Sequence, residues 1–227
     1  MPVRKKAPED LTAKKALALE VIRRLKAEYP DAGCTLDYDH AWQLLVSVRL
    51  AAQCTDARVN IVVEELFAKY PSVAALAAAE PEDIEAIVKP CGLGHSKARD
   101  ISACMRMLRD KYDCRVPDTF EALLALPGVG RKSANLIMGD VFGKPAIVTD
   151  THCIRLCNKI GLVDGIKEPQ KVEMALWKII PPEEGSDLCH RFVMHGRAVC
   201  NARKPECEKC CLKDICRTAR EAAGQQA

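Results

Sequence analysis

Residues 126–134 read Leu-Pro-Gly-Val-Gly-Arg-Lys-Ser-Ala and separate two segments with helical periodicity. Two glycines, Gly128 and Gly130, permit positive φ angles and let backbone N–H groups come close to a ligand. The second helix starts at Arg131, so its free amides and the positive end of its dipole face the same point. A glycine pair alone also fits a plain interhelical turn. The whole stretch predicts a hairpin between helices with an anion site suited to a DNA phosphate.

The rest of the chain shows short apolar-periodic segments separated by proline and glycine. The expected helices span residues 12–28, 41–53, 58–70, 72–80, 81–88, 96–112, 119–125, 131–142, 151–160, 170–180 and 187–199. Only Ala146–Thr149 reads as a short strand. We therefore expect an all-α fold.

The composition is that of a soluble globular protein. The chain has 227 residues, 48% of them hydrophobic and 29% charged, enough for one large domain or two small ones. No apolar run approaches the length of a membrane span, and Met1–Asp10 has no signal-peptide core. The net charge of +3 does not by itself indicate nucleic acid. Most of the 13 cysteines are scattered singly, which predicts reduced thiols in the cytosol or nucleus.

Near the C-terminus four cysteines follow the spacing C-x6-C-x2-C-x5-C: Cys200, Cys207, Cys210 and Cys216. Gathered thiolates repel one another, so a metal ion or an iron–sulfur cluster is expected between them. Zinc sites usually pair their ligands in two short knuckles, and only Cys207 and Cys210 form one here. The spacing therefore favours a [4Fe–4S] cluster, with zinc as the alternative. Cys211 adds a fifth thiol, which is a possible replacement ligand.

A lysine and an aspartate are candidates for catalysis. Lys132 stands beside Arg131 at a helix start, where nearby positive charge and the helix dipole favour a neutral, nucleophilic amine that can form a Schiff base. The alternative role for Lys132 is a cation that holds a phosphate. Asp150, in the segment Val-Thr-Asp-Thr-His at 148–152, also precedes a helix. It fits a plain N-cap or a carboxylate that takes the lysine proton and stabilises positive charge on a sugar ring.

A second turn, Gly-Leu-Gly-His-Ser-Lys-Ala at residues 92–98, echoes the hairpin. It places the apolar Leu93 at an exposed loop tip, where a wedge into a base stack could sit. An ordinary turn between two helices is the alternative.

Together, the hairpin with Lys132, the segment with Asp150 and the terminal cysteine spacing resemble the endonuclease III family of helix-hairpin-helix DNA glycosylases. Further matches are Ala-Gln-Cys-Thr-Asp at 52–56, Gly-Leu at 92–93 and His-Gly-Arg at 195–197. The resemblance runs from the first expected helix to Cys216, with the motifs in the family order.

The resemblance implies a base-excision repair enzyme that removes oxidised pyrimidines from duplex DNA and cleaves abasic sites by β-elimination. Lys132 is then the Schiff-base nucleophile and Asp150 its activator, and the [4Fe–4S] cluster is structural. Gln53 and Leu93 are implied to fill the gap left by the flipped nucleotide. Further DNA contacts are implied for Gly128, Gly130, Arg131, His152, Arg203 and Lys204.

The resemblance also implies two helical domains with a DNA-binding cleft between them. A central six-helix domain would span residues 34–144, and residues 1–33 would join 145–227 in a discontinuous domain closed by the cluster. We expect a monomer that binds damaged double-stranded DNA and no membrane, in the cytoplasm at the nucleoid if bacterial. His152 is expected to orient its neighbours by hydrogen bonding rather than to shuttle protons.

Three alternatives compete with this interpretation. A monofunctional adenine glycosylase of the same superfamily lacks the hairpin lysine and uses an early-helix glutamate, whereas this chain has Lys132 and no carboxylate in residues 42–55. The chain also ends soon after Cys216, where we expect no room for that enzyme's extra domain. A non-enzymatic DNA-binding module, with zinc held by the four cysteines, would be colourless and would bind DNA in a salt-dependent way without cleaving it. A redox sensor that reads the state of the cluster would leave the pair of Lys132 and Asp150 unexplained.

Overall fold

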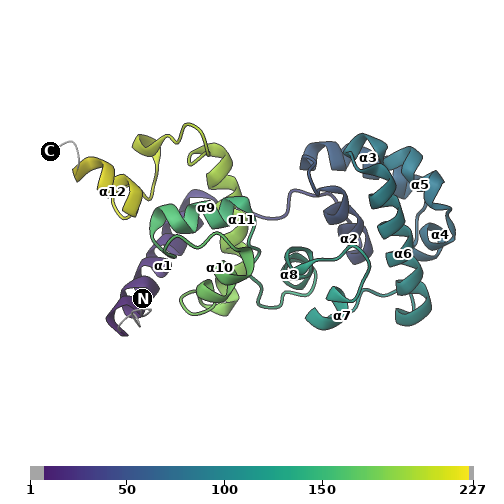
Figure 1. The fold of residues 1–227 in the computed structure, drawn as a ribbon, viewed down its shortest axis with the longest axis horizontal. Helices are drawn as coiled ribbons and strands as arrows, with labels where there is room; N and C mark the ends of the chain where they lie inside the picture. Colours follow the sequence, from purple (N-terminus) through teal and green to yellow (C-terminus); the bar gives the residue numbers. More distant parts are fainter. Residues whose placement is uncertain (1–7, 225–227) are drawn as a thin grey trace, which may run out of the picture. The chain divides into compact units, whose positions relative to one another are not determined.

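Residues 8–224, the part that the computed structural model describes, form helices joined by loops, and no strand occurs within that range (Figure 1). The predicted all-α fold is confirmed. The structure divides into two compact units: unit 1 comprises residues 1–33 and 144–227, and unit 2 comprises residues 34–143. Residues 1–7 and 225–227, which the predicted domains include, lie outside the described residues.

Unit 2 is built around one long helix. Its elements are α2 (Ala41–Leu50), α3 (Asp56–Lys69), α4 (Val73–Ala78), α5 (Pro81–Val88), the 3-10 turn η1 (Lys89–Cys91), α6 (Gly94–Tyr112), α7 (Phe120–Leu124) and α8 (Arg131–Asp140). Helix α6 packs against α2, α4 and α5 (Figure 1). Its buried residues recur at helical spacing, as an amphipathic core helix requires: Ala98, Ile101, Met105 and Leu108.

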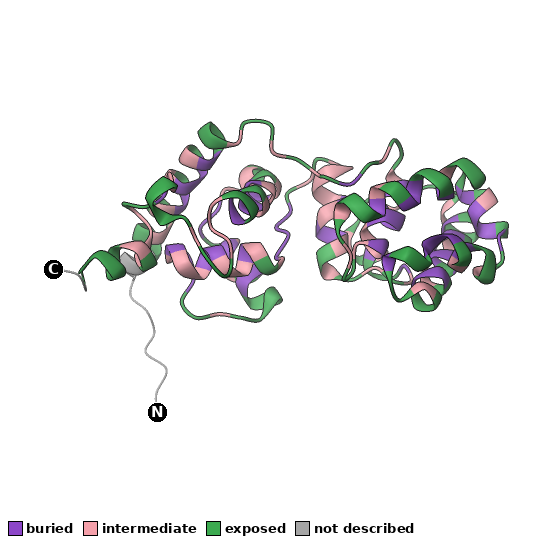
Figure 2. Ribbon diagram, turned by 90° about the horizontal axis from the view of Figure 1, so that it is seen from above, coloured by how far each residue is buried: buried purple, intermediate pink, exposed green. Residues whose placement is uncertain are grey.

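Local signals set where several of these helices begin. Thr55, Ser72 and Thr119 are N-caps whose hydroxyl groups accept a hydrogen bond from a backbone N–H of the first turn. Pro81 occupies the first turn of α5, where its missing N–H costs nothing. Buried residues line the inner faces of the helices and exposed residues the outer faces (Figure 2). The fold of unit 2 therefore follows from capping and amphipathic periodicity.

Unit 1 joins the first helix to the C-terminal ones. Its elements are α1 (Pro8–Glu28), α9 (Thr151–Ile160), α10 (Pro169–Leu176), η2 (Pro182–Glu184), α11 (Gly185–Ala198), η3 (Cys207–Lys209) and α12 (Arg217–Gly224). Helix α11 packs against both α1 and α9. None of the helices described in the two units combines the length and the apolar character needed to cross a membrane.

The strand expected at Ala146–Thr149 was a wrong prediction. The segment is buried and apolar, which produced the strand-like pattern, but it runs among helices. The backbone N–H of Val148 donates to Cys189 Sγ of α11 at 3.2 Å, in place of a carbonyl on a neighbouring strand. The surrounding helices bury the same apolar side chains that a sheet would have buried.

Two helices also differ from the sequence-based expectation. Helix α2 ends at Leu50 instead of Gln53, because Gln53 has a φ of 58°, which lies outside the right-handed helical region. Helix α12 was not predicted, since it buries no residue and so lacks the apolar stripe on which the prediction relies.

Candidate active site and cluster loop

The hairpin lies between α7 and α8, as predicted. Gly128 has a φ of 74°, which favours glycine. A Cβ at Gly128 would lie only 2.8 Å from Cβ of Asp100 and 3.1 Å from Cδ of Arg49. Residue 128 must therefore be glycine for two reasons, backbone conformation and close packing of the turn against α2 and α6.

Gly130 differs from Gly128, and the expectation of positive φ there was wrong. It has a φ of −96° and is the N-cap of α8, with no side-chain cap. No atom lies within 4 Å of the position a Cβ would take. The open space at Gly130 leaves room for an anion at the start of α8.

Two basic residues open helix α8. The guanidinium of Arg131 lies 4.9 Å from the ring centroid of Phe120, a cation–π contact that joins the two helices of the hairpin. Lys132, the next residue, has an exposed side chain. An exposed lysine therefore stands in the first turn of α8, two residues after Gly130.

Asp150 caps helix α9. Its Oδ1 accepts a hydrogen bond from the N–H of Cys153 at 2.7 Å, so the N-cap role considered from the sequence is present. This hydrogen bond uses Oδ1, and the same carboxylate can still accept further hydrogen bonds. Because Lys132 belongs to unit 2 and Asp150 to unit 1, their pairing stays a prediction.

His152 and Arg155 connect α9 to the chain entering the cysteine loop. Nη2 of Arg155 lies 3.2 Å from Nδ1 of His152 and donates to the carbonyls of Gly196 at 3.2 Å and Cys200 at 2.7 Å. The orienting role expected of His152 stays a prediction. Arg155 was missed in the sequence, because its partners lie far along the chain.

Gly196 permits this arrangement, and we expect Gly196→Ala to disrupt it. A Cβ there would lie 2.4 Å from His152 Nδ1 and 2.9 Å from Arg155 Nη2. Such overpacking should lower the free energy of unfolding by about 1–3 kcal/mol, measured by chemical denaturation. The control is Gly33→Ala, because a Cβ at Gly33 would meet no atom within 4 Å. Equal effects of the two substitutions would contradict the expectation.

The two loop residues expected to enter DNA share an unusual backbone conformation. Gln53 has a φ of 58° and Leu93 a φ of 52°, both in the left-handed region that non-glycine residues rarely occupy. Both side chains are exposed, Leu93 at 58%. Backbone strain of this kind concentrates at functional sites.

The four cysteines lie on one loop that follows α11. Cys200 and Cys210 are half-buried on this loop, and Cys207 is exposed. Burial raises the pKa of the Cys200 thiol, and it raises the pKa of Cys210 to about 11. Among the residues that the structure describes, no three His, Cys, Asp or Glu side chains are arranged as ligands of a single metal ion.

The same loop carries the two basic residues expected to contact DNA. Arg203 and Lys204 are both exposed. The side chain of Asn201 fixes the turn between them and Cys200: its Nδ2 donates to the carbonyl of Lys204 and its Oδ1 accepts from the N–H of Lys204, both at 2.6 Å. The turn therefore holds Arg203 and Lys204 at the surface.

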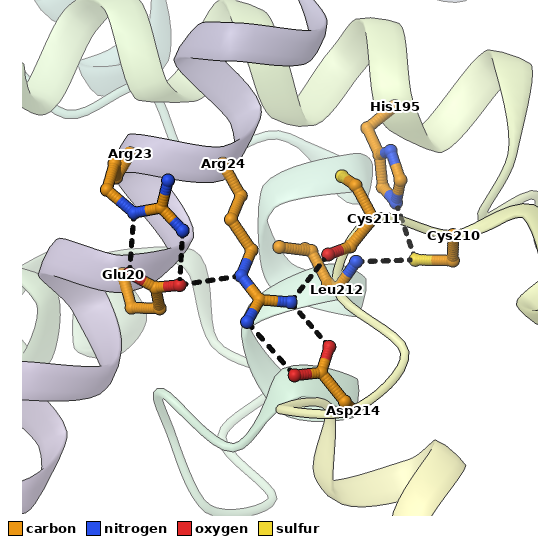
Figure 3. A network of polar contacts seen from close by, with 8 residues as sticks. All are labelled: Glu20, Arg23, Arg24, His195, Cys210, Cys211, Leu212 and Asp214. Carbon is orange, nitrogen blue, oxygen red and sulfur yellow. Dashed lines mark hydrogen bonds and ion pairs between the residues drawn. The ribbon is translucent and has the colours of Figure 1, made fainter.

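A buried histidine of α11 contacts the loop at Cys210 (Figure 3). His195 is 1% exposed, its Nε2 lies 3.3 Å from Cys210 Sγ, and its Nδ1 lies 3.1 Å from the hydroxyl of Tyr29, which follows α1. Burial lowers the pKa of His195. The sequence singled out His195 only as part of a matching tripeptide, and gave no signal of its contact with a cysteine.

Arg24 of α1 holds the other side of the loop (Figure 3). Its guanidinium donates to the carbonyl of Cys211 at 2.8 Å and forms a bidentate ion pair with the carboxylate of Asp214. Glu20 accepts from Nε of Arg24 at 2.7 Å, which orients the guanidinium. The hydrogen bonds from Arg24 hold the pKa of Asp214 below its usual value. The first helix and the cysteine loop are therefore tied together.

Comparisons with known proteins agree with this architecture. Residues 46–182 match the model of the HhH-GPD superfamily of base excision DNA repair proteins. The chain is 42% identical to endonuclease III of Synechocystis sp. over 92% of its length and 95% of the relative's, and 38% identical to endonuclease III of Escherichia coli K12 over 89% and 95%. A solved structure of a trapped endonuclease III–DNA covalent intermediate is 39% identical, with a TM-score of 0.86 over 92% of this chain and 98% of the other. This chain thus belongs to the endonuclease III family, within the HhH-GPD superfamily of base excision DNA repair proteins.

Proposed function

We propose that this chain is a bifunctional DNA glycosylase and abasic-site lyase that removes oxidised pyrimidines from duplex DNA. The observation that carries the proposal is the exposed Lys132 in the first turn of α8, two residues after Gly130 of the hairpin. A similar endonuclease III has been trapped as a covalent intermediate with DNA, which supports a nucleophilic side chain in this family.

DNA binding begins at the hairpin. A phosphate approaches Gly130, where no side chain obstructs the amides of α8, and the helix dipole favours its negative charge. Arg203 and Lys204 add contacts to phosphates from the cysteine loop. The damaged nucleotide leaves the stack, and Gln53 and Leu93 occupy the space it vacates.

The chemistry then follows from an amine and a carboxylate. Asp150 accepts a proton from Lys132, and the neutral amine attacks C1′ of the flipped nucleotide. The bond from C1′ to the base breaks and the base leaves with the electron pair. The departing base takes up a proton from the nitrogen now bound to C1′, and the ring opens as O4′ takes the proton held by Asp150, which gives a protonated imine between Lys132 and C1′. Loss of a proton from C2′ then expels the 3′ phosphate oxygen, so the strand breaks on the 3′ side of the lesion.

The cysteine loop suits an iron–sulfur cluster. Cys200, Cys207, Cys210 and Cys216 would hold a [4Fe–4S] cluster, which when bound supplies a rigid cross-link within the loop. The N–H of Leu212 points at Cys210 Sγ at 3.4 Å, a hydrogen bond that suits a ligating thiolate. His195, Arg24 and Arg155 contact the loop from the helices of unit 1. We assign the site a structural role that also presents Arg203 and Lys204 to DNA.

Substitutions at the two hairpin glycines distinguish an effect on DNA binding from an effect on folding. We expect Gly130→Ala to lower affinity for duplex DNA about tenfold, because the added methyl group projects where the phosphate approaches. Its stability should fall by less than about 1 kcal/mol, since only a glycine cap is lost. Affinity is measured by fluorescence anisotropy at one fixed salt concentration.

Gly128→Ala is the matched control for that measurement. Its Cβ would meet Asp100 at 2.8 Å in a left-handed backbone, so we expect a loss of stability of about 1–3 kcal/mol. A Gly130→Ala protein that binds DNA with unchanged affinity would remove this residue from the phosphate site.

Borohydride trapping tests the proposed activity directly. We expect a covalent adduct on duplexes that carry one thymine glycol or one abasic site, and none on the undamaged duplex. An adduct on the abasic duplex alone would leave a lyase with another lesion as its substrate. No adduct on either duplex, despite salt-dependent binding by a colourless protein, would instead indicate the zinc-containing DNA-binding module.

A further inference from the structure

A lysine that the proposed mechanism does not use is fully buried in unit 2. Lys97, near the start of α6, is 0% exposed and is among the largest fully buried side chains in the described chain. Lysine is almost never buried without partners, because removing its charge from water is expensive. Burial lowers the pKa of Lys97. So costly a residue calls for a specific role.

The side chain of Lys97 joins two loops that are far apart in the sequence. Its Nζ donates to the carbonyl of Leu50 at 2.8 Å and to the carbonyl of Cys91 at 2.8 Å. Leu50 is the last residue of α2, and Cys91 is the last residue of η1. Carbonyl groups at such ends lack partners within the helix and attract a cation. One ammonium group therefore caps both elements at once.

Each capped element leads directly into a candidate DNA wedge. Gln53 lies three residues after Leu50, and Leu93 lies two residues after Cys91. Both wedge residues have positive φ angles and exposed side chains. The backbone N–H of Lys97 also donates to the carbonyl of Leu93 at 3.0 Å. Lys97 is thus bonded to one wedge residue and to the residues that anchor both loops.

A second contact joins the same loops. Burial, and after it the nearby thiol of Cys54, raises the pKa of the Cys91 thiol to about 11, and Cys54 immediately follows Gln53. The loops are therefore in contact beneath their exposed tips, with the Lys97 ammonium bound to backbone carbonyls of both.

We propose that Lys97 is a positioning residue that fixes the Gln53 and Leu93 wedges relative to each other, so that both enter the gap left by a flipped nucleotide. The inference rests on the proposed function. Flipping costs several kcal/mol of stacking and pairing, and wedges offset this cost only if they are already ordered. Lys97 orders them before DNA binds, by holding the two loops as one rigid body.

This role predicts an unequal loss on two substrates. Excision of a paired base requires the nucleotide to be extruded, and so depends on the wedges. The lyase step on a preformed abasic site has no base to unstack, and depends much less on them. A purely structural role of Lys97 would instead lower both activities by the same factor.

The test compares single-turnover rates of Lys97→Met on a thymine glycol duplex and on an abasic duplex. We expect the ratio of excision to lyase rate to fall about tenfold, which corresponds to the loss of a buried hydrogen-bonded contact. Both rates are measured on one protein preparation, so the active fraction cancels. Equal losses on the two duplexes would overturn the proposal.

Arg106→Met is the matched control. Arg106 lies on the same helix and also donates to carbonyls at a helix end, those of Ala77 at 3.2 Å and Ala79 at 3.5 Å at the end of α4. It contacts neither wedge loop through these bonds, so we expect an unchanged ratio. An equal fall of the ratio in Arg106→Met would also overturn the proposal.

A double substitution tests the same point through the wedge. In a Leu93→Ala background, Lys97→Met should change the ratio by clearly less than tenfold, because the group it positions is already gone. Independent effects of the two substitutions would argue against positioning.

If Lys97→Met does not fold, Lys97→Gln, which keeps an amide donor, is measured on the same duplexes. A wild-type protein with no excision and no trapped adduct would instead refute the proposed function itself.

Discussion

Lys132→Gln is expected to abolish strand cleavage and borohydride trapping. The side chain is exposed, so the substitution should leave the fold intact. Glutamine keeps much of the length and the hydrogen bonding of lysine but cannot attack C1′, and loss of a nucleophile lowers rates by about 10⁴ or more. Affinity for the damaged duplex should stay within about threefold, since a single phosphate contact at most is lost. Single-turnover cleavage and fluorescence anisotropy measure the two quantities.

Lys132→Arg distinguishes the nucleophile from a phosphate-binding cation. Arginine retains the positive charge and can hold a phosphate, but it stays protonated and is no nucleophile. We expect it to be as inactive as Lys132→Gln while it binds DNA like the wild type. Cleavage by Lys132→Arg would mean that only the charge at position 132 matters.

The parts of the fold that could be predicted are those that local chemistry determines. The hairpin was predictable because Gly128 needs a left-handed backbone and the helix start at Arg131 follows from the sequence. The strand at Ala146–Thr149 was wrongly predicted, because buried apolar residues look alike in a strand and in a segment covered by helices. The end of α2 was also missed, since Gln53 has no local signal that stops a helix.

In the candidate site too, residues with a local sequence signal could be predicted and residues with remote partners could not. Lys132 and Asp150 stand at helix starts that the sequence marks, and so they could be singled out. The residues that support the loops could not, because their partners are remote: Arg24 binds a carbonyl 187 positions away, and Lys97 binds one 47 positions away. No local periodicity records such contacts. Long side chains that donate to distant backbone carbonyls are visible only in the folded chain.

Cys207→Ala is expected to abolish binding of the proposed [4Fe–4S] cluster and to unfold the cysteine loop of unit 1. Binding of a structural metal group is itself folding free energy, so the loss should amount to several kcal/mol. The melting temperature should then fall by about 10 °C or more, and the broad absorbance near ~400 nm should disappear. Cys207 is exposed, so the loss of side-chain packing alone would cost little. A stable, coloured and active Cys207→Ala protein would contradict the structural role.

Cys211→Ala tests which thiols form the ligand set. Cys211 neighbours Cys210, and its backbone carbonyl, which Arg24 binds at 2.8 Å, is retained in alanine. We therefore expect Cys211→Ala to keep its colour and its melting temperature. If Cys207→Ala kept the colour and the double substitution Cys207→Ala/Cys211→Ala lost it, Cys211 would be able to replace Cys207 as a ligand. The double variant thus separates a fixed set of four cysteines from a set in which the fifth thiol can take part.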